Sequence, residues 1–336
     1  MVEVKSISVL MFGLLGDVLI RTPILKGLRE LYPNARVSVF VDPIGREVLK
    51  NSTLCDEIIV VQRDKKSRLR YIKNKITSMY SLLKLKPDLL IDLYDGGSSY
   101  GMVMLSNAKY KLGMCSSKKA NIYNLKCTRE TLLSDSLYKR CIDVLSALSE
   151  KSFDITPLYS VSDFSNQKII KYIENKQIDM QTTYLLNFGS GGLEKIMEFE
   201  KYKELVVYLY KRYGLTPNII CNPGQEYLQE SFISKYLSQG DVPYKKLPLF
   251  SLDEIGSCIS KSKFIITPDT GLMHLAMAMR TYVYCIFTYT NPCLVDIKSE
   301  KFVSVYDLFE DDILYKEQNI DIQILINRAD ELLRKI

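Results

Sequence analysis

The sequence predicts an α/β protein made of two Rossmann-like halves, each a doubly wound parallel sheet, which face a central cleft. Its 336 residues exceed one typical core and fit two domains of roughly 150 residues each. Short β-branched runs alternate with amphipathic helical segments, and this alternation with short connections is typical of parallel sheets covered on both faces. Three glycine-bearing loops follow predicted strands, at the sheet edge where such folds bind ligands.

The first half opens with a buried strand that runs into the loop Gly13–Asp17. Thr22 and Pro23 are expected to be the N-cap and first residue of the next helix, which ends at the Tyr32-Pro33-Asn34 sequence. Apolar runs and helical periodicity then predict further elements. The expected strands are 6–12, 36–41, 57–61, 89–93 and 110–114, and the expected helices after the first are 46–51, 65–86 and 134–148.

The pattern weakens between residues 152 and 183 and then resumes, which predicts a linker. The expected strands are 184–188, 218–221, 264–267 and 282–287, and the expected helices are 166–175, 200–213, 225–237, 252–260, 271–279 and 322–335. We therefore expect an N-terminal domain at 1–160 and a C-terminal domain at 161–320. The last helix, within 321–336, has one apolar face and is expected to pack back on the N-terminal domain.

Composition indicates a soluble enzyme of the cytoplasm. No apolar run approaches the roughly 20 residues of a membrane span, and the first residues lack the pattern of a secretory signal. Eight cysteines show no C-x-x-C spacing, and several lie in apolar runs. Reduced, mostly buried thiols are therefore favoured over disulfides or a metal site.

The net charge of +6 is concentrated in the first 150 residues, which hold 24 Lys and Arg against 15 Asp and Glu. Eight of these basic residues lie in the predicted helix 65–86, where apolar residues recur at helical spacing. A solvated helix face explains the pattern. So does contact with anionic lipid headgroups or with a phosphorylated glycan. Nucleic acid is disfavoured, because no binding motif accompanies the charge.

The stretch 265–276 is the most informative, because it combines a strand end, a tight loop and a helix start. Asp269, Thr270 and Gly271 form the loop, and the free amides and positive dipole end of the following helix favour a phosphate or diphosphate there. His274, the only histidine, falls in the first turn of that helix. The His274 side chain either packs in the protein interior or contacts a ligand, and the sequence allows both roles.

Two further loops also follow predicted strands and are candidates for ligand binding. Gly189 and Ser190 open a glycine turn that is followed by Lys195. No G-x-G-x-x-G, P-loop or D-x-D motif is present, so helix amides and Lys195 are left to neutralise a diphosphate without a metal. In the first half, Asp17 lies at the mouth of the first strand, where it is either a helix cap or a general base, and Asp95 begins another glycine loop.

These motifs together resemble glycosyltransferase family 9. The likeness covers nearly the whole chain and rests on four features in order: Gly16-Asp17 with Thr22-Pro23, Lys195 after a glycine turn, Asp269-Thr270-Gly271-x-x-His274, and Thr288-x-Thr290-x-Pro292. The family comprises bacterial heptosyltransferases that add ADP-activated heptose to the lipopolysaccharide inner core. The resemblance implies a GT-B fold, an acceptor in the N-terminal domain, a nucleotide-sugar in the C-terminal domain, and metal-free inverting transfer.

The resemblance also implies roles for individual residues. Asp17 becomes the catalytic base, with the acceptor near Gly13, Gly16 and Asp95. The implied donor site comprises Gly189, Ser190, Lys195, Asp269, Thr270, Gly271 and His274. No metal ligand and no cofactor are expected. The chain departs from the family at Met197, where a tryptophan often stands two positions after the lysine.

The expected partners are a nucleotide-sugar, with ADP-heptose favoured, and an acidic glycan or glycolipid acceptor. Peripheral contact with the cytoplasmic face of the inner membrane is compatible with the basic helix. Two alternatives stay open at this point. One is a nucleotide-dependent oxidoreductase or epimerase on the same frame, which the missing nicotinamide motif disfavours. The other is a non-catalytic glycan-binding relative, which the presence of both Asp17 and Lys195 disfavours.

Overall fold

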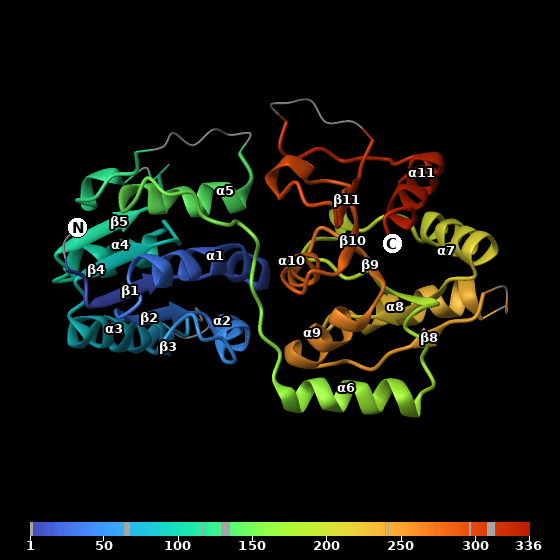
Figure 1. Ribbon diagram of the computed structural model, residues 1–336, viewed down its shortest axis with the longest axis horizontal. Helices are drawn as coiled ribbons and strands as arrows, with labels where there is room; N and C mark the ends of the chain where they lie inside the picture. The colour runs from blue at the N-terminus through green and yellow to red at the C-terminus, as the bar shows by residue number, and fades with distance from the viewer. Residues whose placement is uncertain are drawn as a thin grey trace. The chain divides into compact units, whose positions relative to one another are not determined.

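The computed structural model divides into two compact units, Met1–Ser160 and Val161–Ile336, and each is described by itself (Figure 1). It describes residues 3–63, 68–115, 117, 119–128, 135–238, 240, 242–295, 297–307 and 313–336. Each unit contains one parallel sheet with helices connecting its strands. The predicted α/β class with two parallel-sheet domains is therefore confirmed.

The sheet of the first unit has the strand order β3-β2-β1-β4-β5. Its strands are β1 (Ser6–Leu10), β2 (Arg36–Val41), β3 (Glu57–Val60), β4 (Leu89–Asp92) and β5 (Tyr110–Gly113). All pairings are parallel, and β1 lies between β2 and β4. The chain builds outward from β1 in one direction and then in the other. The loops after β1 and β4 therefore diverge at this edge, and such a switch point is where parallel sheets bind ligands.

Helices cover this sheet on separate faces. They are α1 (Leu15–Leu31), α2 (Pro43–Leu49), α3 (Arg68–Leu85), α4 (Gly97–Leu105) and α5 (Leu137–Ile142). The helix α1 packs against α2 and α5. Leu82 of α3 and Met102 of α4 join Leu10 and Phe12 in one core cluster, so α3 and α4 cover the same face. The sequence reading missed α4, because its glycine and serine residues are typical of a loop.

The first helix begins eight residues earlier than predicted, so Thr22 and Pro23 lie inside it. A proline within a helix removes one backbone donor and leaves the carbonyl four residues earlier unbonded. That carbonyl belongs to Leu19, and it accepts a hydrogen bond from the Thr22 hydroxyl at 2.7 Å. The same hydroxyl accepts one from the Leu158 amide at 2.8 Å. The Thr22 hydroxyl thus satisfies the carbonyl that Pro23 leaves unbonded within the helix. The predicted role of Thr22 as the N-cap was wrong.

The sheet of the second unit has the order β11-β10-β9-β6-β7-β8. Its strands are β6 (Thr183–Asn187), β7 (Thr216–Ile220), β8 (Lys245–Lys246), β9 (Phe264–Pro268), β10 (Tyr282–Ile286) and β11 (Phe302–Val305). All are parallel. The sequence analysis did not identify β8 and β11, because each is short and follows a polar stretch. The switch point of this sheet lies between β6 and β9.

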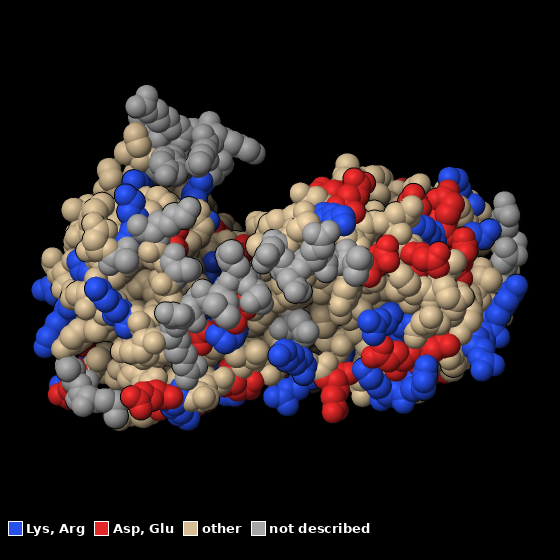
Figure 2. Space-filling view, turned by 90° about the horizontal axis from the view of Figure 1, so that it is seen from above, with Lys and Arg blue, Asp and Glu red and all other residues tan. Residues whose placement is uncertain are grey.

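The helices of the second unit pack on a large aromatic core. They are α6 (Asp163–Asn175), α7 (Phe199–Tyr213), α8 (Glu226–Phe232) with a π-helical turn at Ile233–Leu237, α9 (Leu252–Lys261), α10 (Gly271–Ala278) and α11 (Ile322–Leu333). Phe188 contacts Phe199, Tyr202 and Phe232 with ring centroids 4.5 to 5.2 Å apart. Figure 2 shows acidic and basic side chains intermingled over this unit, where surface ion pairs such as Lys235 with Glu200 form.

The terminal helix α11 corrects one expectation. Its buried residues Leu325, Ala329 and Leu332 belong to the core cluster of the second unit, where α11 packs on α7, β10 and β11. The Tyr284 hydroxyl also donates to the Leu325 carbonyl at 2.6 Å. The apolar face that suggested a return to the N-terminal domain is therefore covered within the C-terminal unit, and that prediction was wrong.

The cysteines correct a second expectation. Cys115 and Cys127 form a disulfide, with their Cα atoms 5.3 Å apart. The chain turns back after β5 so that Leu125 bridges to Leu112, and this return brings the two cysteines together. The other six are free thiols, as predicted. Burial raises the pKa of the Cys258 thiol to about 12, which keeps it protonated at neutral pH.

Candidate functional site

The carboxyl ends of β6 and β9 are neighbours at the switch point of the second unit, and the loops after them meet. Lys195 follows β6 and Asp269 follows β9. The Lys195 Nζ lies 2.6 Å from Oδ2 of Asp269. The aspartate side chain is 9% exposed and the lysine side chain 27% exposed, so the ammonium group still reaches the surface. A cation fixed at this edge of the sheet is suited to an anionic ligand.

The loop that precedes Lys195 is held by amide side chains. Asn187 is fully buried, donates to the Gly189 carbonyl at 3.1 Å and accepts from the Gly189 amide at 3.1 Å. Gln225 donates to the Ser190 carbonyl at 2.8 Å. A Cβ at Gly189 would lie 2.4 Å from Asn222 and 2.5 Å from Gln225, so a larger residue there would displace these two side chains. The turn is thus shaped before any ligand arrives.

The start of α10 adds backbone donors to this loop pair. Thr270 is its N-cap in extended conformation, and its side chain makes no capping hydrogen bond. The first amides of a helix have no intrahelical acceptor, so those of Gly271 and Leu272 can serve a ligand. The positive end of the helix dipole adds to their attraction for an anion. Lys195, paired with Asp269, and the start of α10 are therefore the candidate anion-binding groups of this unit.

His274, a residue of the predicted donor site, and Met197, which departs from the family pattern, lie inside the protein core. His274 is 5% exposed within α10, and Met197 is 4% exposed in the aromatic core cluster. Ser190 is also buried, at 4%, with its hydroxyl 3.5 Å from the Asp269 carbonyl. Met197 thus supplies packing at the position where the family often has tryptophan. The donor-binding role predicted for His274 stays a prediction.

In the first unit, Asp17 lies in the first turn of α1 and makes one specific contact. Its Oδ2 accepts a hydrogen bond from the Leu14 amide at 2.8 Å, while Oδ1 accepts none from any residue that the structure describes. Gly13, with φ of +144°, makes room for the carboxylate, because a Cβ there would lie 2.5 Å from the Asp17 Cβ. Gly16 is the second residue of the same helix. One oxygen therefore holds the loop and the other remains to accept a proton.

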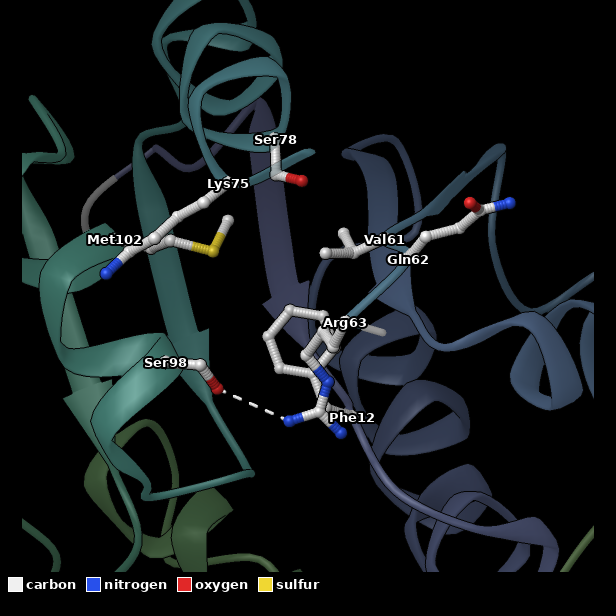
Figure 3. A pocket seen from close by; sticks show the side chains of 8 residues that line it. All are labelled: Phe12, Val61, Gln62, Arg63, Lys75, Ser78, Ser98 and Met102. Atoms are coloured by element: carbon white, nitrogen blue, oxygen red, sulfur yellow. Dashed lines mark hydrogen bonds between the residues drawn. The ribbon is translucent and has the colours of Figure 1, made fainter. Parts of the chain in front are cut away.

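A clamp built on Arg63 supports this loop. The Arg63 guanidinium donates to both oxygens of Asp42, at 2.7 and 2.5 Å. It also donates to the Ser98 hydroxyl at 3.3 Å (Figure 3). It also lies over the rings of Phe12 and Tyr94, 4.7 and 4.4 Å from their centroids. A pocket beside it is lined by Phe12, Val61, Gln62, Arg63, Lys75, Ser78, Ser98 and Met102.

The clamp reaches the Asp17 loop through Asp42. The Gly13 amide donates to Oδ2 of Asp42 at 2.7 Å, so one carboxylate joins Arg63 to the loop after β1. Arg63 follows β3, Asp42 follows β2 and Ser98 belongs to α4. Four neighbouring strand ends are therefore connected at the edge that holds Asp17.

We expect Arg63→Lys to lower the free energy of unfolding by about 2 kcal/mol, because lysine keeps the charge but loses the two-pronged pairing and the ring stacking. Urea denaturation followed by circular dichroism measures the change. The matched control is Arg36→Lys, since Arg36 pairs with Glu57 at 3.0 Å but is 65% exposed. That variant should stay within about 0.5 kcal/mol of the wild type. Equal losses in both variants would contradict the clamp.

Asp95, a residue predicted to bind the acceptor, is positioned by the buried carboxylate of Asp92. Asp92 is fully buried at the end of β4, where its Oδ1 accepts from the amides of Tyr94 and Asp95 and its Oδ2 from the Tyr123 hydroxyl at 3.0 Å. Burial raises the pKa of the Asp92 carboxyl above its usual value. Asp95 has φ of +50°, and its Oδ1 accepts from Tyr100 and Ser117.

The sequence analysis missed Asp42, Arg63 and Asp92. Each stands directly at or just after a strand end, and that position alone was the available signal. Arg63 was hidden by the basic run that follows it. No group of three or more His, Cys, Asp or Glu within the described part of the chain could hold a metal ion. The expectation of metal-free chemistry stays a prediction.

Comparison with known proteins identifies the family. The model of glycosyltransferase family 9 (heptosyltransferase) matches residues 79–307, more than half of the chain. The chain belongs to glycosyltransferase family 9. Lipopolysaccharide heptosyltransferase 1 of Campylobacter coli is 23% identical over 297 residues, which cover 84% of this chain and 83% of that relative.

Solved structures of glycosyltransferase family 9 share the fold. The enzyme of this family from Veillonella parvula superposes with a TM-score of 0.80 at 20% identity, covering 99% of this chain and 98% of that one. The ADP-heptose lipopolysaccharide heptosyltransferase II of Escherichia coli superposes with a TM-score of 0.74 at 16% sequence identity. The superposition covers 98% of this chain and 99% of that one. The GT-B class predicted from the sequence is therefore confirmed, as is its assignment as a glycosyltransferase.

Proposed function

We propose that this family 9 glycosyltransferase transfers heptose from ADP-heptose to an acidic, lipid-linked glycan of the lipopolysaccharide core type, with inversion at the anomeric carbon. The observation that carries the proposal is the anion site in the second unit, where Lys195 lies beside the start of α10 at the sheet switch point. The relatives from C. coli and E. coli are lipopolysaccharide heptosyltransferases, and this similarity supports the choice of heptose and lipopolysaccharide.

The proposal assigns the donor to the second unit and the acceptor to the first. The acceptor hydroxyl attacks the anomeric carbon, and Oδ1 of Asp17 takes its proton. The bond from that carbon to the diphosphate oxygen breaks as the new bond forms. The negative charge that develops on the leaving diphosphate is stabilised by Lys195 and by the amides of Gly271 and Leu272. The loop that precedes Lys195 is fixed before reaction by the contacts of Asn187 and Gln225, and the Lys195 side chain is held by Asp269.

The decisive experiment measures sugar transfer directly. The protein is incubated with ADP-heptose, UDP-sugars or NAD, each with and without a heptose-deficient lipopolysaccharide acceptor. We expect ADP release and acceptor heptosylation with ADP-heptose only, and only when the acceptor is present. Sugar conversion without acceptor would favour an epimerase, NAD turnover an oxidoreductase, and thermal stabilisation without transfer a glycan-binding relative. Transfer from a UDP-sugar would overturn the choice of donor.

Turnover should not depend on a divalent metal. A metal neutralises the diphosphate in many transferases, but here a lysine and the first amides of a helix are available for that charge. We expect the initial rate in excess EDTA to equal the rate in untreated buffer. Loss of activity in EDTA with recovery on adding magnesium or manganese would contradict the proposed electrostatic stabilisation.

The acceptor assignment rests on charge and on the first unit's site. An acidic glycolipid would be attracted by the excess of basic residues in the first half of the sequence. We place the reaction at the cytoplasmic face of the inner membrane. Among the described residues, no helix combines the length and the apolar character that a membrane crossing requires.

A further inference from the structure

The helix α3 has apolar side chains on both of its faces. Leu82 is fully buried in the core cluster of the first unit. On the opposite side Ile72, Ile76 and Tyr80 are exposed, by 44%, 63% and 66%. They are spaced four residues apart, so they form one stripe along the helix. A covering helix normally presents polar residues to water, and an aligned apolar stripe indicates a contact surface.

Lysines flank this stripe on both sides. At about 100° per residue, Ile72, Ile76 and Tyr80 span roughly 80° of the helix circumference. Lys75 falls on one side of that arc, and Lys73 and Lys84 fall on the other. All three lysines are exposed. Their aliphatic stems can lie along apolar surface while the ammonium groups reach polar partners.

The charge of this segment is unbalanced. Residues 65–86 contain eight Lys and Arg and no Asp or Glu. A second copy of the same helix would bring like charges together, which opposes self-association through this face. A free phosphorylated glycan would satisfy the lysines but would leave the apolar stripe in water. An anionic bilayer surface satisfies both, because it offers phosphate groups beside an apolar interior.

We propose that the exposed face of α3 docks on an anionic lipid bilayer. Ile72, Ile76 and Tyr80 enter the boundary between headgroups and acyl chains, and Lys73 and Lys84 contact lipid phosphates. This surface is separate from the transfer chemistry proposed above and does not depend on it.

The test is co-sedimentation of the full chain with vesicles, without donor or acceptor. We expect the wild type to bind phosphatidylcholine vesicles that contain phosphatidylglycerol and not vesicles of phosphatidylcholine alone. The double variant Ile76→Ser with Tyr80→Ser should bind the anionic vesicles with an affinity at least about tenfold lower, because it removes the two most exposed groups of the stripe. Lys73→Gln with Lys84→Gln should also weaken binding, and the wild type should lose binding as salt is raised.

The matched control changes exposed apolar residues of the second unit. Tyr227 and Leu249 are 56% and 47% exposed, so Tyr227→Ser with Leu249→Ser removes similar groups and should bind vesicles like the wild type. Melting curves and thermal stabilisation by ADP-heptose, run on every variant, check that fold and donor site are unchanged. Loss of donor response with retained vesicle binding would count against the proposed function alone.

Three results would overturn the docking proposal. The first is a wild type that ignores anionic vesicles, and the second is an Ile76→Ser, Tyr80→Ser variant that binds them equally well. The third is a wild-type dimer in analytical ultracentrifugation that this variant dissociates, which would assign the stripe to contact between copies of the chain.

Discussion

Asp17→Asn is expected to leave a folded protein that has lost most of its transferase activity. In the structure, one carboxylate oxygen accepts from the Leu14 amide and the other accepts no hydrogen bond from a described residue. Asparagine can keep the first contact with its carbonyl oxygen, so the bond from this third helical residue to the N-cap amide of Leu14 is preserved. It cannot take up a proton. Because a general base typically contributes about 10² to 10⁴ in rate, we expect turnover to fall by at least roughly a hundredfold.

The measurement is kcat with saturating donor and acceptor, beside a melting curve and a donor Kd for each form. The matched control is Asp321→Asn, since Asp321 caps α11 by accepting from the Gln323 amide at 2.7 Å. It should leave turnover unchanged. Asp17→Ala should lose the cap as well, with about 1 kcal/mol of stability. Normal turnover in Asp17→Asn would show that Asp17 is only a cap and leave the base to be found elsewhere.

Lys195→Ala is expected to weaken donor binding by roughly ten- to a hundredfold, because a charge-assisted contact to a phosphate contributes about 1.5 to 3 kcal/mol. The structure adds a second effect. Asp269, only 9% exposed, would lose the cation 2.6 Å away, so the variant should also be less stable. Calorimetry with ADP-heptose and urea denaturation measure the two effects separately.

A double variant separates binding from stability. In Lys195→Ala with Asp269→Asn, the unpaired buried charge is removed, so stability should recover while donor affinity stays low. Lys235→Ala is the surface control, because Lys235 is 64% exposed in its pair with Glu200 and should change neither quantity. Unchanged donor affinity in Lys195→Ala would remove this lysine from the donor site.

The parallel-sheet architecture was predictable because α7 is long and has helical apolar periodicity, and because β9 is a short, continuously buried run rich in β-branched and aromatic residues. Features that depend on distant contacts were not. Thr22-Pro23 resembles a helix start in isolation, and only the contacts to Leu19 and Leu158 explain it within α1. The apolar face of α11 predicts burial, but it does not specify which unit covers it.

The pairing of Lys195 with Asp269 follows from a strand order that no local pattern reveals. The sequence identified both loops as a possible anion site, while their direct contact depends on β6 lying beside β9. The Arg63 clamp was harder to foresee, because it joins Asp42, Phe12 and Tyr94 from three separate strand ends. Side chains that act by holding a loop have no motif of their own.

The division of the chain after Ser160 has a consequence for biosynthesis. Every strand of the first sheet lies before residue 114, and the core cluster around Phe12 and Leu82 is formed by residues between Leu10 and Tyr123. N-terminal domains generally fold as units while the ribosome is still adding later residues. Since α11 completes the second unit, the nascent first unit needs no segment from the end of the chain. We therefore expect it to reach its folded state during translation, before the second unit has emerged.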